Sequence, residues 1–599
     1  MNRVLSFSFL MIVHAVALSQ SGSNAEITVG ELREHVKFLA SDKLEGRRAG
    51  SKGADRAADY IRQAFRSYGL VPVGDNGSYF QRFEFVAGIK LGSSNKLSFS
   101  IAGRRSTLAV DQDFRPLGFS SSETYEGELL FAGYGISAPD KNYDDYSGLD
   151  VKGKAVIVLR NAPPSDTARD FAQYASLRYK AGKAKELGAK AMIVVTGPED
   201  SEMDDLIKLS YDQATGNAGI VALHVTRKRA DELLLGQQKK IKDLQKNINQ
   251  SRSPHSFVVA GSSVSATVDL QEIRQTTANV AGLIEGSDAV LKDQVLVIGA
   301  HYDHLGFGGE GSGSLKPDTI AVHNGADDNA SGTAGLLELA QAFAAQRTML
   351  NRSILFMTFS GEELGLLGSA RYVKNPLVPI ERTVAMLNMD MIGRMNNRSL
   401  IVYGIGTSPG FEELAKRNNK DSTFVLKLNK DGYGPSDHAS FYGKQIPVFH
   451  FFTDLHSDYH RPSDDYDKLN YQGMADVVRY VEAITKDLDD AKEKPQYVAV
   501  EAPRPAGAGR SSRVFMGTIP DFGEQVEGMK LSGVREGSPA AKCGLQGGDV
   551  IVKFGKVDIK NLYDFTYALG EYKPGDEVEV VFKRGDETRR CRVTLERRN

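Results

Sequence analysis

The sequence predicts an α/β protein whose central domain is a mixed, mostly parallel sheet flanked by helices. Between residues 278 and 490, short apolar runs alternate with helical patterns, as is typical of a sheet covered on both faces. Residues 125–270 instead contain short β-rich runs, and a second β-rich segment closes the chain. Several domains are expected, because a single core stops growing near ~250–300 residues and the chain has 599.

The composition excludes several classes of protein. Lys and Arg total 74 and Asp and Glu total 76, which gives a net charge of −2. A main partner made of nucleic acid is not expected, because phosphate binding needs a basic surface. Hydrophobic residues make up 41% and charged residues 25%, which fits neither a disordered chain nor a membrane bundle. With only Cys543 and Cys591, the chain is not a disulfide scaffold.

The first residues have the pattern of a secretory signal peptide. Arg3 precedes an almost wholly apolar run from Val4 to Leu18, and Ala15-Val16-Ala17 supplies the small residues of a cleavage site. We therefore expect residues 1–19 to be removed and the protein to be exported, to the periplasm or outside the cell. No later run reaches the ~18 apolar residues of a membrane-spanning helix, so no span is expected in the mature chain.

The central domain begins with residues 26–110. Six apolar residues there recur at helical spacing and form one buried helix face, which ends before Gly69: Ala54, Ala57, Ala58, Ile61, Ala64 and Phe65. Residues 111–272 form a β-rich insert, with strands near 128–135, 154–159 and 191–195 and a helix near 178–187.

Residues 273–490 complete the central domain. Strands are predicted at 295–298, 353–359, 384–389 and 447–452, and helices at 332–345 and 473–488. Residues 491–511 are rich in Pro, Gly and Ala and predict a linker, and residues 512–599 form a C-terminal module.

Residues able to bind metal follow the predicted central strands. The candidates are two histidines and several carboxylates that lie just after a strand, before a helix or in a late loop: His301, Asp327, Asp328, Glu362, Glu363, Asp390 and His460. In open α/β sheets the ligand site lies beyond the carboxyl ends of the strands. So many carboxylates in one crevice would repel each other unless cations were present, and imidazole with carboxylate oxygen suits zinc.

Each candidate alone has a simpler explanation. A single His at a strand end is more often structural, an Asp before a helix is usually an N-cap, and a Glu pair is usually a solvated surface. Their joint placement at strand ends favours a metal centre.

Five phrases make the resemblance to a known family specific. They are Gly299-Ala300-His301-Tyr302-Asp303, Gly325-Ala326-Asp327-Asp328-Asn329-Ala330-Ser331-Gly332, Ser360-Gly361-Glu362-Glu363-Leu364-Gly365, Asn388-Met389-Asp390-Met391 and Tyr459-His460-Arg461-Pro462. On these phrases, residues 30–85 and 278–490 resemble the co-catalytic di-zinc aminopeptidase family of secreted and plasma-membrane exopeptidases. The resemblance implies the zinc exopeptidase fold.

The resemblance also implies the ligand set of two Zn²⁺ ions per chain. Asp328 is expected to bridge the ions, His301 and Asp390 to complete one site, and Glu363 and His460 the other. Between the adjacent Asp327 and Asp328, the second is chosen by this resemblance.

Three further residues have roles implied by the resemblance or by physical chemistry. Glu362 is the expected general base, and Tyr433 the expected tyrosine that helps to polarise the scissile carbonyl. Asp303 is expected to orient the ring of His301, because metal-bound histidines usually donate their other N–H to such a partner.

Several neighbouring residues stay open. His456 competes with His460 as a ligand, although the Arg461-Pro462 that follows favours His460. Asp437 and His438 match the family but are interpreted as structural. His304 and His323 receive no role.

The implied function is that of an exported zinc aminopeptidase. It would hydrolyse N-terminal residues from peptides or proteins with a free N-terminus, through a di-zinc-activated water. A carboxypeptidase or other amide hydrolase on the same site is the alternative within enzymes. An inactive receptor or scaffold is the alternative outside them, but it would be expected to have lost ligands.

The flanking segments resemble two known modules. Phe131-Ala132-Gly133-Tyr134-Gly135 and Val151-Lys152-Gly153-Lys154 resemble the protease-associated domain inserted in many members of this family. The C-terminal module resembles a bacterial PDZ domain, in which Phe515, Met516, Gly517 and Thr518 would bind the C-terminus of a peptide. Cys543 and Cys591 are interpreted as two small buried residues, with pairing after export left open.

Overall fold

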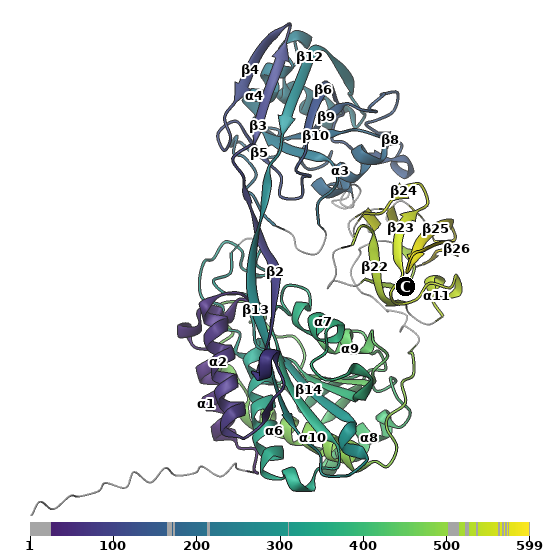
Figure 1. The fold of residues 1–599 in the computed structure, drawn as a ribbon. Coiled ribbons are helices and arrows are strands. Elements are labelled where there is room, and N and C mark those ends of the chain that lie inside the picture. The colour runs from purple at the N-terminus through teal and green to yellow at the C-terminus, as the bar shows by residue number, and fades with distance from the viewer. Residues whose placement is uncertain are drawn as a thin grey trace, which may run out of the picture.

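The computed structural model describes residues 25–500 and 514–597, apart from short stretches at 165–170, 172–173, 212–215, 310, 521–525, 535–536, 561–563, 566–567, 570–571 and 573. The predicted signal peptide and residues 501–511 of the predicted linker lie outside the described residues. Figure 1 shows the central domain below, the insert above, and the C-terminal module alongside both. Within the described ranges, no helix has the length and apolar composition needed to cross a membrane.

The central domain is built on a nine-stranded mixed sheet. Four parallel strands form its middle, in the order β15 (Ser353–Phe359), β14 (Val295–His301), β16 (Thr383–Met389) and β19 (Val448–Phe452). Every residue of β14, β15 and β16 is buried, which explains why their sequences are continuously apolar rather than alternating. The remaining strands are β1 (Val71–Pro72), β2 (Phe80–Leu91), β13 (Leu270–Ile284), β17 (Ser399–Tyr403) and β18 (Val425–Leu428). The predicted mixed, mostly parallel sheet is confirmed.

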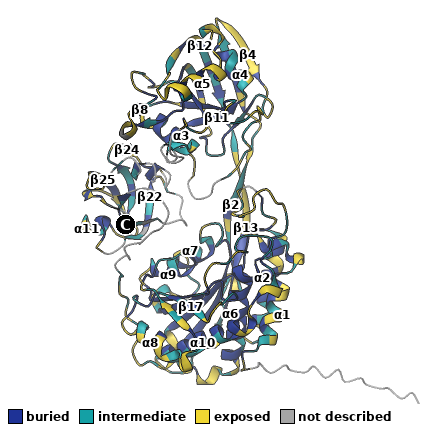
Figure 2. Ribbon diagram, turned by 180° about the vertical axis from the view of Figure 1, so that it is seen from behind, coloured by how far each residue is buried: buried dark blue, intermediate teal, exposed yellow. Residues whose placement is uncertain are grey.

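Helices cover both faces of this sheet (Figure 2). One face carries α1 (Val29–Leu39), α2 (Lys52–Ser67), α6 (Gly332–Ala345), α8 (Phe411–Asn418) and α10 (Tyr471–Asp490), and the other carries α7 (Leu367–Lys374) and α9 (His438–Tyr442). Helix α2 starts after Ser51, whose side chain accepts the Ala54 N–H, as an N-cap does. Its predicted buried face is confirmed, with only Ala64 partly exposed.

The insert is a second domain with an eight-stranded sheet in the order β4-β3-β12-β6-β9-β10-β11-β5. Its strands are β3 (Lys96–Ile101), β4 (Arg104–Leu108), β5 (Phe114–Pro116), β6 (Thr124–Phe131), β9 (Ala155–Leu159), β10 (Ala191–Val195), β11 (Val221–Val225) and β12 (Phe257–Thr267), with helices α3 (Leu177–Glu186), α4 (Arg227–Leu233) and α5 (Ile241–Ser251). This sheet already includes residues from Lys96 onward, which the boundary expected at residue 111 placed in the central domain. Strand β3 joins it by pairing with β12, a long-range contact that local patterns do not show.

A two-stranded ribbon joins the insert to the central domain. Strands β2 and β13 run antiparallel, from the pair Phe80 and Val280 beside the central sheet to the pair Leu91 and Leu270 at the insert. Figure 1 shows this ribbon as a long arm between the two domains.

The C-terminal module is a small antiparallel sheet in the order β21-β22-β23-β25-β26. Its elements are β20 (Val514–Phe515), β21 (Thr518–Pro520), β22 (Met529–Val534), α11 (Pro539–Lys542), β23 (Val550–Phe554), β24 (Val557–Asp558), β25 (Glu577–Arg584), β26 (Glu587–Thr594) and β27 (Glu596–Arg597). Cys543 and Cys591 form a disulfide. The interpretation of them as two separate buried residues is therefore wrong, because α11 and β26 lie side by side.

The C-terminal module contacts the insert, and the segment that leads toward it is docked on the central domain. In that segment, at the start of the expected linker, Val498 N–H donates to the Thr407 carbonyl at 2.9 Å and Val500 N–H to the Tyr442 hydroxyl at 2.7 Å. On the insert side, the Lys185 ammonium lies 3.1 Å from the Asp564 carboxylate, which is 3% exposed. The expected linker at 491–511 thus begins with residues that are already packed.

Candidate metal centre

The ends of the parallel strands bring the predicted metal residues together. His301 is the last residue of β14, Asp390 directly follows β16, and Glu362 and Glu363 follow β15 in the next turn. Because β14, β15 and β16 are parallel neighbours, these side chains leave the same edge of the sheet. Asp328 lies in the turn before α6, and His460 lies in the loop after β19.

Two groups of donor atoms form at this edge. In the first, His301 Nε2 lies 3.2 Å from Asp390 Oδ1 and 3.4 Å from Asp328 Oδ1. In the second, His460 Nε2 lies 3.2 Å from both Asp328 Oδ2 and Glu363 Oε2. The two oxygens of Asp328 thus face different groups, as a carboxylate shared by two ions must.

These distances fit zinc. Ligand atoms held about 2.0–2.1 Å from a tetrahedral zinc ion lie roughly 3.3 Å from each other. The four His–carboxylate separations in the two groups are 3.2, 3.4, 3.2 and 3.2 Å. The histidine and carboxylate donors are thus already spaced as ligands of a small cation.

The charges of the centre also favour cations. Burial alone would raise the pKa of Asp328, but hydrogen bonds from His301 and His460 hold it well below its usual range. Burial opposes the protonation of His460, yet its contacts with Asp328 and Glu363 raise its pKa to about 10. Positive charge at this position is therefore stabilised by carboxylates that water cannot screen.

The neighbouring Glu362 and Glu363 have different surroundings. Both oxygens of Glu363 contact histidines, with Oε1 2.6 Å from His304 Nδ1 and Oε2 3.2 Å from His460 Nε2. Glu362 stands further out, with Oε2 4.0 Å from His301 Nε2. Burial raises the pKa of Glu362 well above its usual value, and the charge of Glu363 adds to the shift. A carboxylate with a raised pKa beside a metal centre has the properties of a general base.

Asp303 lies close to His301 but contacts it mainly through its backbone. His301 Nδ1 is 3.2 Å from the Asp303 carbonyl oxygen and 3.8 Å from the carboxylate Oδ1. The carboxylate Oδ1 instead accepts the Glu362 N–H at 3.1 Å. Asp303 therefore contacts both the β14 and the β15 end of the site.

The structure separates Asp327 from Asp328 and His456 from His460. Asp327 points away from the donor groups: its Oδ1 accepts the Gly393 N–H at 2.6 Å and its Oδ2 lies 3.3 Å from His456 Nε2. Asp464 Oδ2 accepts both the Asp327 and Asp328 N–H groups, at 2.9 and 3.2 Å. Asp327, His456 and Asp464 thus support the turn that presents Asp328.

Tyr433 lines a pocket together with Gly365 and Leu366, which follow Glu363 in the chain. Its half-buried ring packs edge-on against Tyr442, with the ring centres 4.5 Å apart. Asp437 and His438, which were interpreted as structural, are fully buried nearby, and the His438 ring stacks on His450 at 4.3 Å.

Three residues near the centre received no role from the sequence reasoning. His304 is buried and forms a possible metal-binding group with Asp328 and Glu363. The ring of Tyr459 stacks on His460, with the centres 3.8 Å apart. Arg47, from the segment between α1 and α2, is 1% exposed. His304 directly follows the phrase that ends at Asp303, and Tyr459 is part of the phrase that contains His460, whereas Arg47 gave no signal.

Arg47 connects the segment after His301 to the loop that carries Asp328. Its guanidinium donates to four backbone carbonyls, those of Leu39, Tyr302, Asn324 and Gly325, at 2.6, 2.8, 2.6 and 2.9 Å. It thereby ties the end of α1 to both loops.

Comparisons with known proteins cover all three domains. Residues 279–485 match the model of peptidase family M28, residues 125–233 that of the PA domain, and residues 520–595 that of the PDZ domain. Aminopeptidase YwaD of Bacillus subtilis (strain 168) is 24% identical over 443 residues, covering 67% of this chain and 83% of that protein. Leupeptin-inactivating enzyme 1 of Streptomyces exfoliatus is 34% identical over 137 residues, covering 23% of this chain and 31% of that protein.

Two solved structures are also similar. An aminopeptidase from Aneurinibacillus sp. strain AM-1 aligns with a TM-score of 0.45 and 23% identity, over 80% of this chain and 96% of that chain. BSAP, a zinc aminopeptidase from Bacillus subtilis, aligns with a TM-score of 0.46 and 20% identity, over 79% of this chain and 99% of that chain.

The sheet with two His–carboxylate groups at its edge defines a metal-dependent α/β enzyme. Residues 279–485 match peptidase family M28, with a PA-domain match inserted before them and a PDZ-domain match at the C-terminal end. The predicted resemblance to this family and the predicted flanking modules are confirmed.

Proposed function

We propose that this chain is a zinc-dependent aminopeptidase that removes N-terminal residues from peptides at a centre of two zinc ions. The observation that carries the proposal is the position of Asp328, whose two oxygens lie 3.4 Å from His301 and 3.2 Å from His460. The aminopeptidase named among the curated relatives supports the same activity.

The ligand roles follow from the two donor groups. We assign His301 and Asp390 to one ion, Glu363 and His460 to the other, and Asp328 to both, with His304 close enough to join the second group. Bound zinc supplies a Lewis acid that polarises the substrate carbonyl and lowers the pKa of a coordinated water.

The chain's own residues then move the proton and hold the substrate. Glu362 accepts the proton of the attacking water and returns it to the leaving amine, for which its raised pKa is suited. Tyr433 donates its hydroxyl proton toward the scissile carbonyl oxygen. Asp303 fixes the positions of His301 and of the turn that carries Glu362. Its carbonyl contacts the His301 ring, and its carboxylate accepts the Glu362 N–H. The carboxylates around the centre attract the positively charged N-terminus of a peptide.

The remaining assignments belong to the same proposal. The chain is exported by residues 1–19, and Phe515, Met516, Gly517 and Thr518 bind the C-terminus of a peptide. Gly517 adopts φ +82° and the Met516 carbonyl accepts the Ala540 N–H at 2.9 Å, which fixes this loop against α11. The domain limits are those expected from the sequence, 26–110 and 273–490 for the peptidase, 111–272 for the insert and 512–599 for the PDZ domain, except that β3 and β4 move from the peptidase to the insert.

One assay tests the activity. The purified protein is offered a panel of aminoacyl-p-nitroanilides, together with the same compounds acetylated at the amino group. We expect cleavage of the free amines only, loss of activity on chelation, recovery with zinc, and about two zinc ions per chain by elemental analysis. A fully active metal-free preparation would overturn the proposal, and cleavage that requires a free carboxylate but no free amine would indicate a carboxypeptidase.

A further inference from the structure

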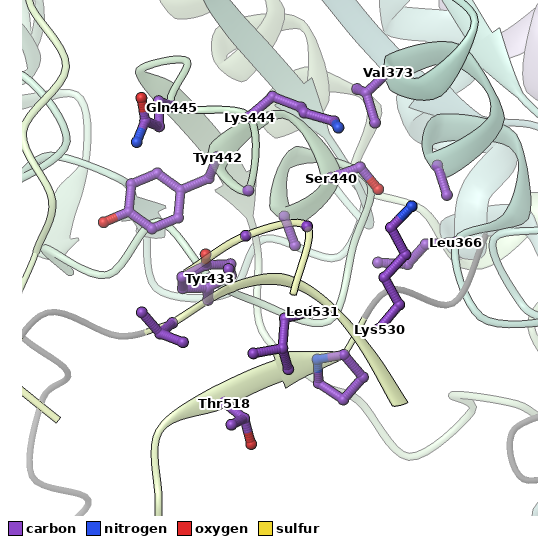
Figure 3. A pocket seen from close by; sticks show the side chains of 18 of the residues that line it. Leu366, Val373, Tyr433, Ser440, Tyr442, Lys444, Gln445, Thr518, Lys530 and Leu531 are labelled. Atoms are coloured by element: carbon purple, nitrogen blue, oxygen red, sulfur yellow. The ribbon is translucent and has the colours of Figure 1, made fainter. Parts of the chain in front are cut away.

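A pocket lies between the central domain and the PDZ domain. Its volume is about 940 Å³, at the upper end of the ~300–1,000 Å³ of small-molecule sites. The peptidase wall comes from the turn before α7 and from α9, and the PDZ wall comes from β21, β22 and residues 546–548. Figure 3 shows side chains from both walls turned toward the space between them.

The lining of the pocket includes the end of the turn that carries Glu363. Gly365 and Leu366, which line it, follow Glu363 by two and three residues. Tyr433 also lines it, and so does Ser440, whose hydroxyl lies 2.9 Å from that of Ser369 in α7. A peptide with its first residue at the metals would reach this lining at Gly365 and Leu366 and then pass Tyr433.

Among the residues that the structure describes, the charged ones that line the pocket are all basic. Lys374 and Lys444 come from the central domain and Lys530 comes from the PDZ domain, and the lining contains no Asp or Glu among the described residues. In Figure 3 the side chains of Lys444 and Lys530 extend from opposite walls, and their amino ends lie on the same side of the pocket. The rest of the lining is mostly glycine, hydroxyl and apolar groups, which suits a peptide backbone that ends in an anion.

The size of the pocket limits the length of the peptide. A volume of about 940 Å³ corresponds to a space roughly 10 Å across, and an extended residue spans about 3.3–3.6 Å. Two or three residues beyond the scissile bond therefore fill it. The contact of Lys185 with Asp564 ties the PDZ domain to the insert.

We propose that this pocket binds the C-terminal carboxylate of a short peptide whose N-terminal residue lies at the metal centre, with Lys444 and Lys530 as the two cationic contacts. The inference rests on the proposed aminopeptidase activity and gives it a substrate class, namely tripeptides and tetrapeptides with a free carboxylate. The site is formed by β21, β22 and the peptidase surface together. The sheet of the PDZ domain is therefore part of the substrate-binding site.

The test compares matched peptides. The full-length enzyme with its metal is given tri- and tetrapeptides of one sequence as free acids and as C-terminal amides, and kcat/KM is measured for each. The readout is the ratio of kcat/KM for the acid to that for the amide. We expect the wild-type ratio to exceed one and to fall by about two- to fivefold in Lys444→Met and in Lys530→Met, as for a partly exposed ion pair. Lys583→Met, at an exposed position of β25 outside the pocket lining, is the control and should keep the wild-type ratio.

The outcomes separate the two proposals. If the wild type cleaves acids and amides equally well, or if both pocket variants keep the wild-type ratio, the carboxylate site is overturned while the aminopeptidase activity stands. If the wild type cleaves neither peptide acids, amides nor aminoacyl-p-nitroanilides, the proposed function itself fails. A decline of the acid preference as the peptide is lengthened to six residues would support the size of the site.

Discussion

Replacing Glu362 by Gln separates the general base from the ligands beside it. The carboxylate stands 4.0 Å from His301 Nε2, outside the 3.2–3.4 Å contacts that His301 makes with Asp390 and Asp328. The substitution therefore leaves the donor atoms in place. It removes a proton acceptor that contributes about 10²–10⁴ in rate, which corresponds to roughly 2.7–5.4 kcal/mol of transition-state stabilisation.

Replacing Glu363 by Gln should act on the metal instead. Its two oxygens lie 2.6 Å from His304 and 3.2 Å from His460. An amide can accept with one atom only, so one histidine would face an N–H₂ group and the centre would lose a negative charge. Changing a residue that merely supports a ligand costs about 10–100-fold in metal affinity, so the loss at Glu363 should be at least that large.

The assay measures zinc content and kcat on the same samples after dialysis against a graded chelator series. We expect Glu362→Gln to keep the wild-type zinc content with kcat reduced at least about 10²-fold. Glu363→Gln should release zinc at a lower chelator concentration and recover part of its activity when zinc is added. Equal loss of zinc from both variants would refute the division of roles between these neighbours.

Three further predictions concern Arg47, the PDZ domain and the insert. Arg47→Met removes the donor from four backbone carbonyls, three of them buried, at about 1 kcal/mol or more for each buried one. The unfolding temperature should therefore fall by several degrees and zinc should be held less firmly, and an unchanged unfolding temperature would contradict the role of Arg47 in holding the two loops. A chain that ends after Val500 keeps the segment that docks on Tyr442. It should retain near-normal kcat on aminoacyl-p-nitroanilides. Loss of that activity would instead show that the PDZ domain contributes to catalysis. Burial lowers the pKa of His224 in the insert to about 3, whereas in the unfolded chain it is about 6.5. The unfolded chain therefore binds the extra proton between these values, and the stability of the insert is lost as pH falls from 6.5 toward 3. The insert's unfolding temperature should fall less between pH 7.5 and pH 5 in His224→Gln than in wild type, and an identical drop would refute the assignment.

The sequence predicted the parts of the fold that are set by local pattern. The buried parallel strands appear as continuous apolar runs, and helix α2 appears through its spacing and its Ser51 cap. The ligand candidates were visible because each one directly follows a strand or precedes a helix, and parallel strands end at one edge.

The parts that were missed depend on contacts between distant segments. Arg47 lies more than 250 residues from Tyr302, Asn324 and Gly325, whose carbonyls it binds, and nothing in its local sequence indicates that it is buried. His304 is close to His301 in the chain, but only the fold places its Nδ1 against Glu363. Strand β3 joins the insert sheet through β12, about 160 residues later.

The ribbon of β2 and β13 makes the insert an exchangeable part. Both chain connections to the insert pass through these two strands, which pair side by side from Phe80 and Val280 to Leu91 and Leu270. Because the strands are antiparallel neighbours, a tight two-residue turn could join them at any level. The central sheet would keep all its strands, its order and its metal-binding edge. The peptidase domain is thus continuous in space although the insert interrupts it in sequence. An insertion of any size at this hairpin can change which peptides reach the metal centre and leave the fold of the peptidase domain unchanged.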